Sequence, residues 1–363
     1  MKQKQMKILI AAGGTGGHLF PGVALAESFV KRDGISVLFV GTMRGLETKL
    51  LPPLGWKLLL LPAVSLKDRH GIKKITSYAR LPLLLFRAFC LVMFEKPSRV
   101  VSIGGYAAGP VTLVASLLRI PTVLLEPNAI PGLTTRLLAR WVSLICLGLP
   151  EAARALPQKK VMLTGTPVRK SILGVRSKSS KEKVKPFTVL CFGGSQGAQK
   201  INRAVLEALP HLQELTSSLR FIHQIGTQEK RERVKQVYTE RGFEASVFEF
   251  IGAMEKVYEE ADLVIARAGA MTIAELTIAT LPSILIPYPY SADDHQRANA
   301  ESLVRIGGAT MILEAELTGE RLANEIKKLT EDSRHLLSMS QALLKRRQPD
   351  AAERIVNECL NVK

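Results

Sequence analysis

Short apolar runs alternate with longer helix-patterned segments along almost the whole chain, and this alternation constrains the fold more than any other feature. A run of about four to eight apolar residues between turn residues is typical of a strand that is buried on both faces. Strands that alternate with helices predict parallel sheets with crossover helices. The runs that fit this pattern are Lys7–Ala12, Ser36–Val40, Leu58–Leu61, Arg99–Ile103, Thr122–Leu125, Ser143–Cys146, Phe187–Phe192, Arg220–Ile225, Ser246–Phe250, Leu263–Ala266 and Ser283–Pro287.

A polar segment separates the first six runs from the last five. Its sequence, GVRSKSSKEKVKP over Gly174–Pro186, has the Ser/Lys-rich composition of a linker or surface loop. A length of 363 residues also favours two domains over one. We therefore expect an α/β chain of two Rossmann-like, doubly wound parallel-sheet domains, in which ligands bind beyond the carboxyl ends of the strands.

Glycine-rich turns follow three of the predicted strands. They are GGTGG (Gly13–Gly17), GGYAAG (Gly104–Gly109) and GGSQG (Gly193–Gly197), and a fourth glycine turn opens a helix within RAGAMTIAE (Arg267–Glu275). Each would expose backbone N–H groups at the positive end of a helix dipole, which favours phosphate. Taken alone, each of these segments could equally be a tight strand-to-helix turn that binds no ligand. Two in each half favour phosphate binding on both sides of a cleft.

Several common nucleotide and metal motifs are absent from the sequence. The dinucleotide fingerprint GxGxxG fails because Leu19 stands where the last glycine is needed, and Val40-Gly41-Thr42 offers no acidic residue for a ribose. No GxxxxGK(S/T), HExxH or DxD occurs, and the six histidines do not cluster at metal-ligand spacing. A nucleoside diphosphate would be neutralised by helix N-termini and side chains, and we expect neither a metal site nor a cofactor.

Positive charge is concentrated in the first half of the chain. Residues 1–166 carry 22 Lys and Arg against 7 Asp and Glu, a net charge of +15, whereas residues 167–363 carry 28 against 25, a net charge of +3. A basic domain favours an anionic partner such as a membrane surface, a phosphorylated ligand or nucleic acid. Aromatic residues make up only 6% of the chain and are dispersed, which disfavours single-stranded nucleic acid.

The cysteines and tryptophans are expected in the cores. Trp56 and Trp141 are interpreted as packing anchors. No run reaches the roughly 18 apolar residues of a membrane span, and the first apolar run is too short for a signal peptide. Four cysteines without a CxxC pair are expected to be reduced core residues of a cytosolic protein: Cys90, Cys146, Cys191 and Cys359.

Seven short stretches of the sequence are each weak motifs, and only their combination is specific for one protein family. They are GGTGGHLFPG, GGYAAGP, EPNAIPGLTTRLLA, GTPVR, GGSQGAQKIN, RAGAMTIAE and DHQRANA. In this order, over nearly the whole chain, they resemble the MurG-type UDP-N-acetylglucosamine:lipid I transferases of peptidoglycan synthesis. The resemblance implies a GT-B fold with two domains facing a cleft. It implies an acceptor- and membrane-binding domain (residues 1–168), a UDP-GlcNAc-binding domain (169–344) and a C-terminal helix returning to the first domain (345–363).

The resemblance also implies the reaction and its setting. An inverting displacement would move GlcNAc from UDP-GlcNAc to the muramyl 4-hydroxyl of lipid I, undecaprenyl-diphosphate-MurNAc-pentapeptide, and give lipid II. This chemistry requires no covalent enzyme intermediate and no metal. The expected partners are UDP-GlcNAc, lipid I, an anionic membrane surface and cell-wall synthesis proteins, with no nucleic acid. The expected location is peripheral, on the cytoplasmic face of the bacterial inner membrane.

Donor contacts are implied mostly in the second half of the chain. The main chain of Ile251 would pair with uracil, the Glu275 carboxylate would accept both ribose hydroxyls, and the Gln296 amide would read sugar hydroxyls. Ser195 would touch phosphate and Arg169 would contact the nucleotide. The segment that opens the next helix would also bind the donor, its first N–H groups meeting the diphosphate: Ala270, Met271, Thr272, Ile273 and Ala274.

Acceptor chemistry is implied in the first half of the chain. Transfer requires a base for the 4-hydroxyl proton, and the histidine pKa of about 6.5 suits His18 to that task. His18 could instead contact phosphate or the acceptor, or simply pack, and Glu126 is the second candidate base. Asn128 would bind the sugar, while Pro127 replaces a Gln common in the family and so removes an amide and a backbone donor. The cleft would be lined by Thr15, Gly16 and Gly17.

A helix within Lys73–Lys96 is the candidate membrane contact. Lys73, Arg80 and Arg87 recur at a spacing of seven and would form one basic stripe on an apolar cylinder, with Pro82 in an early turn or breaking the helix. Such a helix can lie at a bilayer interface with its charges on anionic headgroups. The alternative is a buried crossover helix that shows one stripe to water.

Two other functions remain open at this point. One is a GT-B transferase that acts on another lipid acceptor, such as diacylglycerol. The other is a non-catalytic basic protein that binds nucleic acid or membrane, for which UDP would cause no thermal shift.

Overall fold

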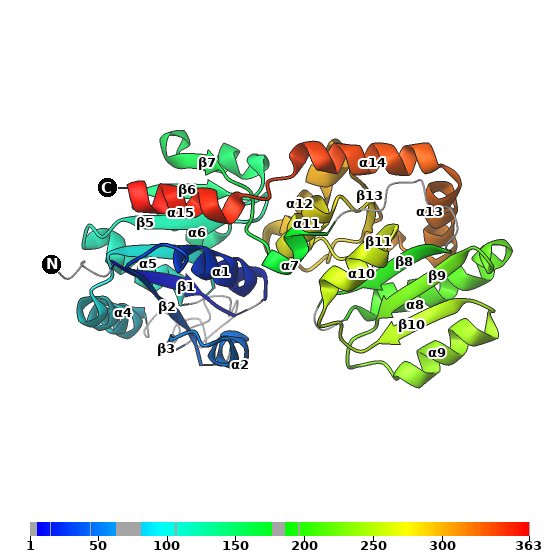
Figure 1. Cartoon of the computed structure of the whole chain (residues 1–363), viewed down its shortest axis with the longest axis horizontal. Helices are drawn as coiled ribbons and strands as arrows, with labels where there is room; N and C mark the ends of the chain where they lie inside the picture. Colours follow the sequence, from blue (N-terminus) through cyan, green and yellow to red (C-terminus); the bar gives the residue numbers. More distant parts are fainter. Residues whose placement is uncertain are drawn as a thin grey trace. The chain divides into compact units, whose positions relative to one another are not determined.

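The computed structural model describes residues 6–14, 16–43, 45–62, 81–105, 107–175, 186–194 and 197–362. The chain divides into two compact units (Figure 1). Unit 1 comprises Met1–Arg169 together with Gln348–Lys363, and unit 2 comprises Lys170–Arg347. Unit 1 is therefore discontinuous in sequence, and Arg169 is its last residue before the chain enters unit 2.

Unit 1 contains a seven-stranded sheet in the order β3-β2-β1-β4-β5-β6-β7, with every pair parallel. The order reverses between β1 and β4, which is where doubly wound sheets bind ligands. The strands are β1 (Met6–Ala12), β2 (Ile35–Thr42), β3 (Leu58–Leu61), β4 (Arg99–Gly104), β5 (Thr122–Glu126), β6 (Leu144–Leu147) and β7 (Val161–Leu163).

Helices cover both faces of this sheet. Ile8 and Ile10 of β1 pack in one core with α1 and α15, whereas Leu9 and Ala11 pack in another with α4 and α5. This alternation explains why β1 is apolar throughout. α15 lies against α1 (Figure 1). The helices of unit 1 are α1 (Gly16–Phe29), α2 (Glu47–Leu50), α4 (Leu81–Glu95), α5 (Ala108–Leu117), α6 (Leu133–Leu138) and α15 (Ala351–Asn361).

Unit 2 contains a six-stranded parallel sheet in the order β10-β9-β8-β11-β12-β13. Here the order reverses between β8 and β11. Its strands are β8 (Phe187–Phe192), β9 (Leu219–Gln224), β10 (Glu244–Phe248), β11 (Leu263–Ala266), β12 (Ser283–Leu285) and β13 (Ala309–Met311). Its helices are α7 (Lys170–Leu173), α8 (Gln199–Ala208), α9 (Arg231–Glu240), α10 (Met254–Glu260), α11 (Ala270–Ala279), α12 (His295–Arg305), α13 (Gly319–Glu331) and α14 (Ser333–Arg346).

The structure confirms two doubly wound parallel-sheet units, and each predicted strand overlaps an observed one. The strand predicted over Ser246–Phe250 ends earlier, at Phe248. The two strands that the sequence analysis missed, β7 and β13, have only three residues each. Short 3-10 turns complete the description: Pro52–Leu54, Pro150–Ala155, Gln158–Lys160, Leu209–Leu215, Ala292–Asp294 and Glu314–Glu316.

Three expectations about individual segments are wrong. Cys90 is exposed on α4, whereas the other three cysteines are buried; all four are free thiols. Trp141 is 55% exposed, whereas Trp56 packs edge-on against Phe39. The C-terminal helical pattern is broken between α14 and α15, at Gln348-Pro349, because proline cannot donate a helical hydrogen bond.

Across the described ranges, no helix combines the length and apolar character that a bilayer crossing requires.

Candidate functional site

The four glycine turns lie at the four strand ends that flank the two reversal points. In unit 1 they follow β1 and β4, and in unit 2 they follow β8 and β11. The predicted site residues therefore gather at the ligand-binding edge of each sheet. Thr15, Ser195, Lys73 and Arg80 lie outside the described residues.

His18 lies in the first turn of α1, against the turn that follows β4. A Cβ atom at Gly104 would lie 2.9 Å from both Cδ2 and Nε2 of the His18 ring, so only glycine allows this approach. A Cβ at Gly105 would lie 2.3 Å from the carbonyl oxygen of Gly13. Both Gly104 (φ +117°) and Gly105 (φ +93°) also adopt conformations that favour glycine. The two glycine turns of unit 1 thus meet beside the His18 imidazole.

Gly16 and Gly17 are the first two residues of α1, as their predicted role in a phosphate-binding turn requires. One donor of the turn is already engaged, because the N–H of Gly14 donates to Oε2 of Glu47 over 2.8 Å. Glu47 is fully buried and was missed by the sequence analysis.

Glu126, at the end of β5, organises the loop that follows it. Its Oε1 accepts from the backbone and side-chain nitrogens of Asn128, at 3.1 and 3.0 Å. Its Oε2 accepts from the N–H of Gly132 at 2.9 Å and from the hydroxyl of Thr135 at 2.6 Å. All four hydrogen bonds tie the carboxylate to its own loop, an arrangement that favours an organising role. Its role as a base stays a prediction.

Arg169 is held beside α1. Its guanidinium carbon lies 4.9 Å from the centroid of the Phe20 ring, within range of a cation–π interaction. This contact fixes the predicted nucleotide-contacting arginine within unit 1.

Gln224 connects two loops of unit 2. It ends β9, the strand between β8 and β10, and is 3% exposed. Its Nε2 donates to the carbonyl of Gly194 over 2.8 Å, and its Oε1 accepts from the N–H of Ile251 over 2.9 Å. A uracil contact through that N–H would have to share it with Gln224. This role of Gln224 was not predicted from the sequence.

Next to Gln224 in β9, His223 belongs to a buried polar triad within the otherwise apolar core of unit 2. Nδ1 of His223 lies 3.0 Å from the hydroxyl of Tyr238, and Nε2 lies 3.2 Å from Oδ1 of Asn202. Nδ2 of Asn202 donates to the carbonyl of Ile225, which leaves Oδ1 to accept from Nε2–H. Burial lowers the pKa of His223 to about 4, so the ring is neutral at pH 7.

α11 begins after β11 with Gly269 in an extended conformation. Ala270, Met271 and Thr272 form its first turn, as predicted. The N–H of Ile273 already donates to the carbonyl of Gly269 over 2.9 Å, and the side chain of Ile273 is buried in the unit. This geometry supports a diphosphate contact for the first three residues only. Ala274, next along the helix, is half-buried.

Glu275 is 7% exposed and accepts a hydrogen bond from the phenol of Tyr258, over 3.1 Å to Oε2. The ring of Tyr258 packs against Phe192, at the end of β8. A tyrosine of α10, packed against the last residue of β8, thus helps to orient the predicted ribose acceptor.

Gln296 lies in the first turn of α12. Its Oε1 accepts from the N–H of Tyr288 over 3.0 Å. Arg267 fixes the same loop: Nη1 donates to the carbonyls of Ile286 and Pro287, and the guanidinium lies 5.4 Å from the centre of the Tyr288 ring. Its Nη2 also forms an ion pair with Glu314.

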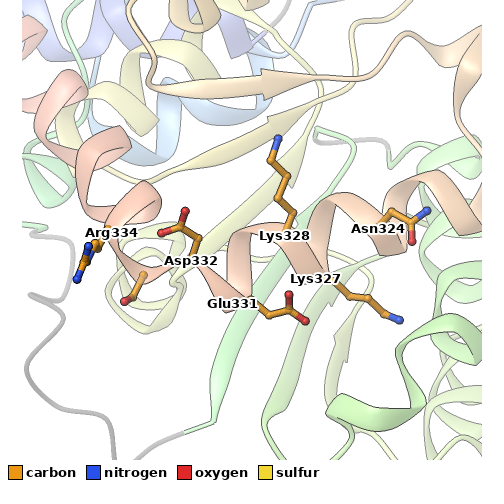
Figure 2. A pocket seen from close by; sticks show the side chains of 7 residues that line it. Asn324, Lys327, Lys328, Glu331, Asp332 and Arg334 are labelled. Carbon is orange, nitrogen blue, oxygen red and sulfur yellow. The ribbon is translucent and has the colours of Figure 1, made fainter.

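Figure 2 shows a separate pocket on α13 and the start of α14. It holds none of the predicted site residues. Lys327 pairs with Glu214, and the Asp332 carboxylate accepts from the N–H of His335. Lys327 is therefore paired within the protein, and Asp332 caps α14. In the part of the chain that the structure describes, no group of three or more His, Cys, Asp or Glu residues could hold a metal ion.

Comparison with known proteins agrees with this geometry. The Glycosyltransferase family 28 N-terminal domain model matches residues 8–146, and the Glycosyltransferase family 28 C-terminal domain model matches residues 188–355. The crystal structure of Acinetobacter baumannii MurG superposes with a TM-score of 0.82 at 29% identity, covering 98% of this chain and 100% of that one. The GT-B fold expected from the resemblance is thereby confirmed.

Two curated relatives share nearly their full length with the chain. Both are named UDP-N-acetylglucosamine–N-acetylmuramyl-(pentapeptide) pyrophosphoryl-undecaprenol N-acetylglucosamine transferase. The Myxococcus xanthus (strain DK1622) protein is 44% identical over 98% of this chain and 93% of its own length. The protein of Citrifermentans bemidjiense (strain ATCC BAA-1014 / DSM 16622 / JCM 12645 / Bem) is 45% identical over 97% of this chain and 98% of its own length. The chain therefore belongs to glycosyltransferase family 28 and, within it, to the MurG family.

Proposed function

We propose that the protein transfers GlcNAc from UDP-GlcNAc to the muramyl 4-hydroxyl of lipid I and so forms lipid II for peptidoglycan synthesis. The observation that carries this proposal is the identity of 44–45% to transferases of that name over 97–98% of the chain. The glycine turns at both reversal points supply the amide-rich helix starts that two diphosphate substrates require.

On the donor side, the leaving UDP gains negative charge as the sugar departs. The start of α11, at Ala270–Thr272, directs N–H groups and the positive end of the helix dipole at that charge. Glu275 holds the ribose, Ile251 holds the base and Gln296 reads the sugar, with Ser195 and Arg169 as further contacts. Inversion follows from a single displacement at the anomeric carbon.

On the acceptor side, His18 removes the proton of the attacking hydroxyl. Its place against Gly104, beside the first N–H groups of α1, supports this role because the acceptor diphosphate and the base would then be neighbours. Asn128 binds the sugar. A phosphate contact through His18, with Glu126 as the base, is the alternative.

The membrane contact is proposed for α4. Leu84, Ala88 and Val92 form its buried stripe, with Leu85 and Leu91 packed beside it, and a further set of apolar side chains faces outward. The exposed side chains are Leu83, Phe86, Phe89, Met93 and Phe94, with Arg87 among them. A buried crossover helix would not expose three phenylalanines, whereas an interfacial helix does. We place this contact on the cytoplasmic face of the inner membrane.

The direct test is turnover of UDP-GlcNAc with a short-chain lipid I analogue, with diacylglycerol as the competing acceptor. Formation of the disaccharide lipid only from the lipid I analogue is expected. Turnover with diacylglycerol but not with the lipid I analogue would show that lipid I is not the acceptor. Absence of a UDP-induced thermal shift would favour a non-catalytic protein.

A further inference from the structure

Glu47 is a fully buried carboxylate beneath the first glycine turn. Its Oε1 accepts from the backbone N–H of Thr42 at 2.6 Å and from the Thr42 hydroxyl at 3.0 Å. Its Oε2 accepts from the N–H of Gly14 at 2.8 Å. One side chain thus connects the end of β2 with the turn that follows β1.

Three glycines make room for this carboxylate. A Cβ atom would lie 2.4 Å from the Glu47 side chain at Gly13, 2.5 Å at Gly41 and 2.0 Å at Gly45. No other residue type fits these three positions without displacing Glu47. The glycines of this region are therefore needed to accommodate the buried Glu47 side chain, whether or not they also contact a ligand.

A buried carboxylate is costly unless several donors stabilise the charge. Glu47 has three donors, and hydrogen bonds to an ionised group are stronger than neutral ones. Its contact with Gly14, which has a left-handed φ of +92°, restrains a backbone that glycine would otherwise leave free. Gly14 lies two residues before α1 and four before His18.

We propose that Glu47 is a positioning residue for the acceptor half of the reaction. Its carboxylate fixes the turn after β1, and so sets where His18 and the first N–H groups of α1 meet the acceptor diphosphate. Because Glu47 occupies the Gly14 N–H, the diphosphate is left with the N–H groups at the start of α1. The inference rests on the proposed function, since the acceptor is the lipid diphosphate named there.

The test is Glu47→Gln, with Glu27→Gln as the control. Gln keeps the shape, but its one oxygen can serve only Thr42 or Gly14, and its NH₂ group must then face an N–H donor. Glu27 is an exposed carboxylate on α1. We expect faster backbone hydrogen exchange in peptides covering residues 10–20 of the Glu47→Gln protein, and unchanged exchange in the Glu27→Gln protein.

Kinetics supply the second readout. We expect kcat/KM for the short-chain lipid I analogue to fall roughly tenfold or more, the loss expected when a charged hydrogen bond is removed, while the Kd for UDP changes less than about twofold. Unchanged acceptor kinetics would overturn the inference, and so would parallel losses of UDP affinity, acceptor turnover and thermal stability. If Glu47→Gln does not fold, Thr42→Val removes one donor to the same carboxylate and is held to the same two readouts.

The two proposals fail in different ways. If the wild-type protein does not turn over lipid I, the proposed function is wrong. If the wild-type protein is active and Glu47→Gln retains wild-type exchange and kinetics, only the role of Glu47 is wrong.

Discussion

The phenol of Tyr258 donates a hydrogen bond to the carboxylate of Glu275 over 3.1 Å, and both side chains are buried in unit 2. This bond orients the oxygen pair that would receive the ribose. Tyr258→Phe removes the donor without changing the ring, and we expect the KM for UDP-GlcNAc to rise about fivefold, or about 1 kcal/mol. Glu275→Ala should raise it further.

Steady-state kinetics with the donor and the acceptor varied separately check this prediction. The KM for the lipid I analogue should stay within twofold in both variants. An unchanged donor KM in Glu275→Ala would contradict the ribose assignment.

His18→Ala is expected to reduce kcat roughly 100-fold or more, because a positioned base contributes about that factor. The affinity for UDP should stay close to that of the wild type, because UDP binding is assigned mainly to unit 2. Calorimetric titration with UDP beside turnover assays separates the two effects. Comparable losses of both would point to a structural role for His18.

The exposed face of α4 should carry vesicle binding. Phe86 and Phe94 are 62% and 85% exposed, and burial of a phenylalanine side chain stabilises by about 1.5–3 kcal/mol. Phe86→Ser with Phe94→Ser should weaken binding to anionic vesicles at least about tenfold, and Arg87→Glu should weaken it further at low salt. Phe250→Ser, at a 61% exposed ring in unit 2, is the matched control. Vesicle binding that survives the α4 changes would place the membrane contact elsewhere.

His223 should make the protein sensitive to mild acid. Its pKa is about 4 in the folded protein against 6.5 for an ordinary histidine, so between pH 6.5 and 4 the unfolded chain binds the extra proton. The free energy of unfolding should therefore decrease as the pH is lowered from 6.5 to 4, by about 3 kcal/mol in all. His223→Gln should flatten this dependence in denaturant titrations, whereas His211→Gln, at an exposed position, should not. An unaltered slope in His223→Gln would assign the acid sensitivity to other groups.

Much of the fold could be predicted because a strand buried on both faces is apolar along its whole length. β7 and β13 escaped prediction because both are short edge strands that are only partly buried, whereas β12, equally short, is buried throughout. The exposure of Cys90 was missed because an apolar helix normally faces the core, and nothing in the local sequence says that α4 has only one buried stripe. Trp141 lies in the turn after α6, and its local sequence does not show that the ring faces outward.

The parts of the candidate site that are built from a few consecutive residues could be predicted from the sequence. The glycine turns and the start of α11 are such features, because each forms within a few residues of a strand end. Glu47 and Gln224 were not predictable in the same way. Glu47 bonds to Gly14, 33 residues away, and Gln224 bonds to Gly194 and Ile251, 30 and 27 residues away. Only the folded sheet brings those partners together.

The discontinuity of unit 1 affects how the chain is made. Its core includes Ile355, Val356 and Cys359 of α15, together with residues of β1 and α1. During synthesis, the first 169 residues leave the ribosome with one side of their core uncovered, whereas unit 2 is complete before α15 emerges. The half that is translated first can therefore complete its core only after α15 has been made.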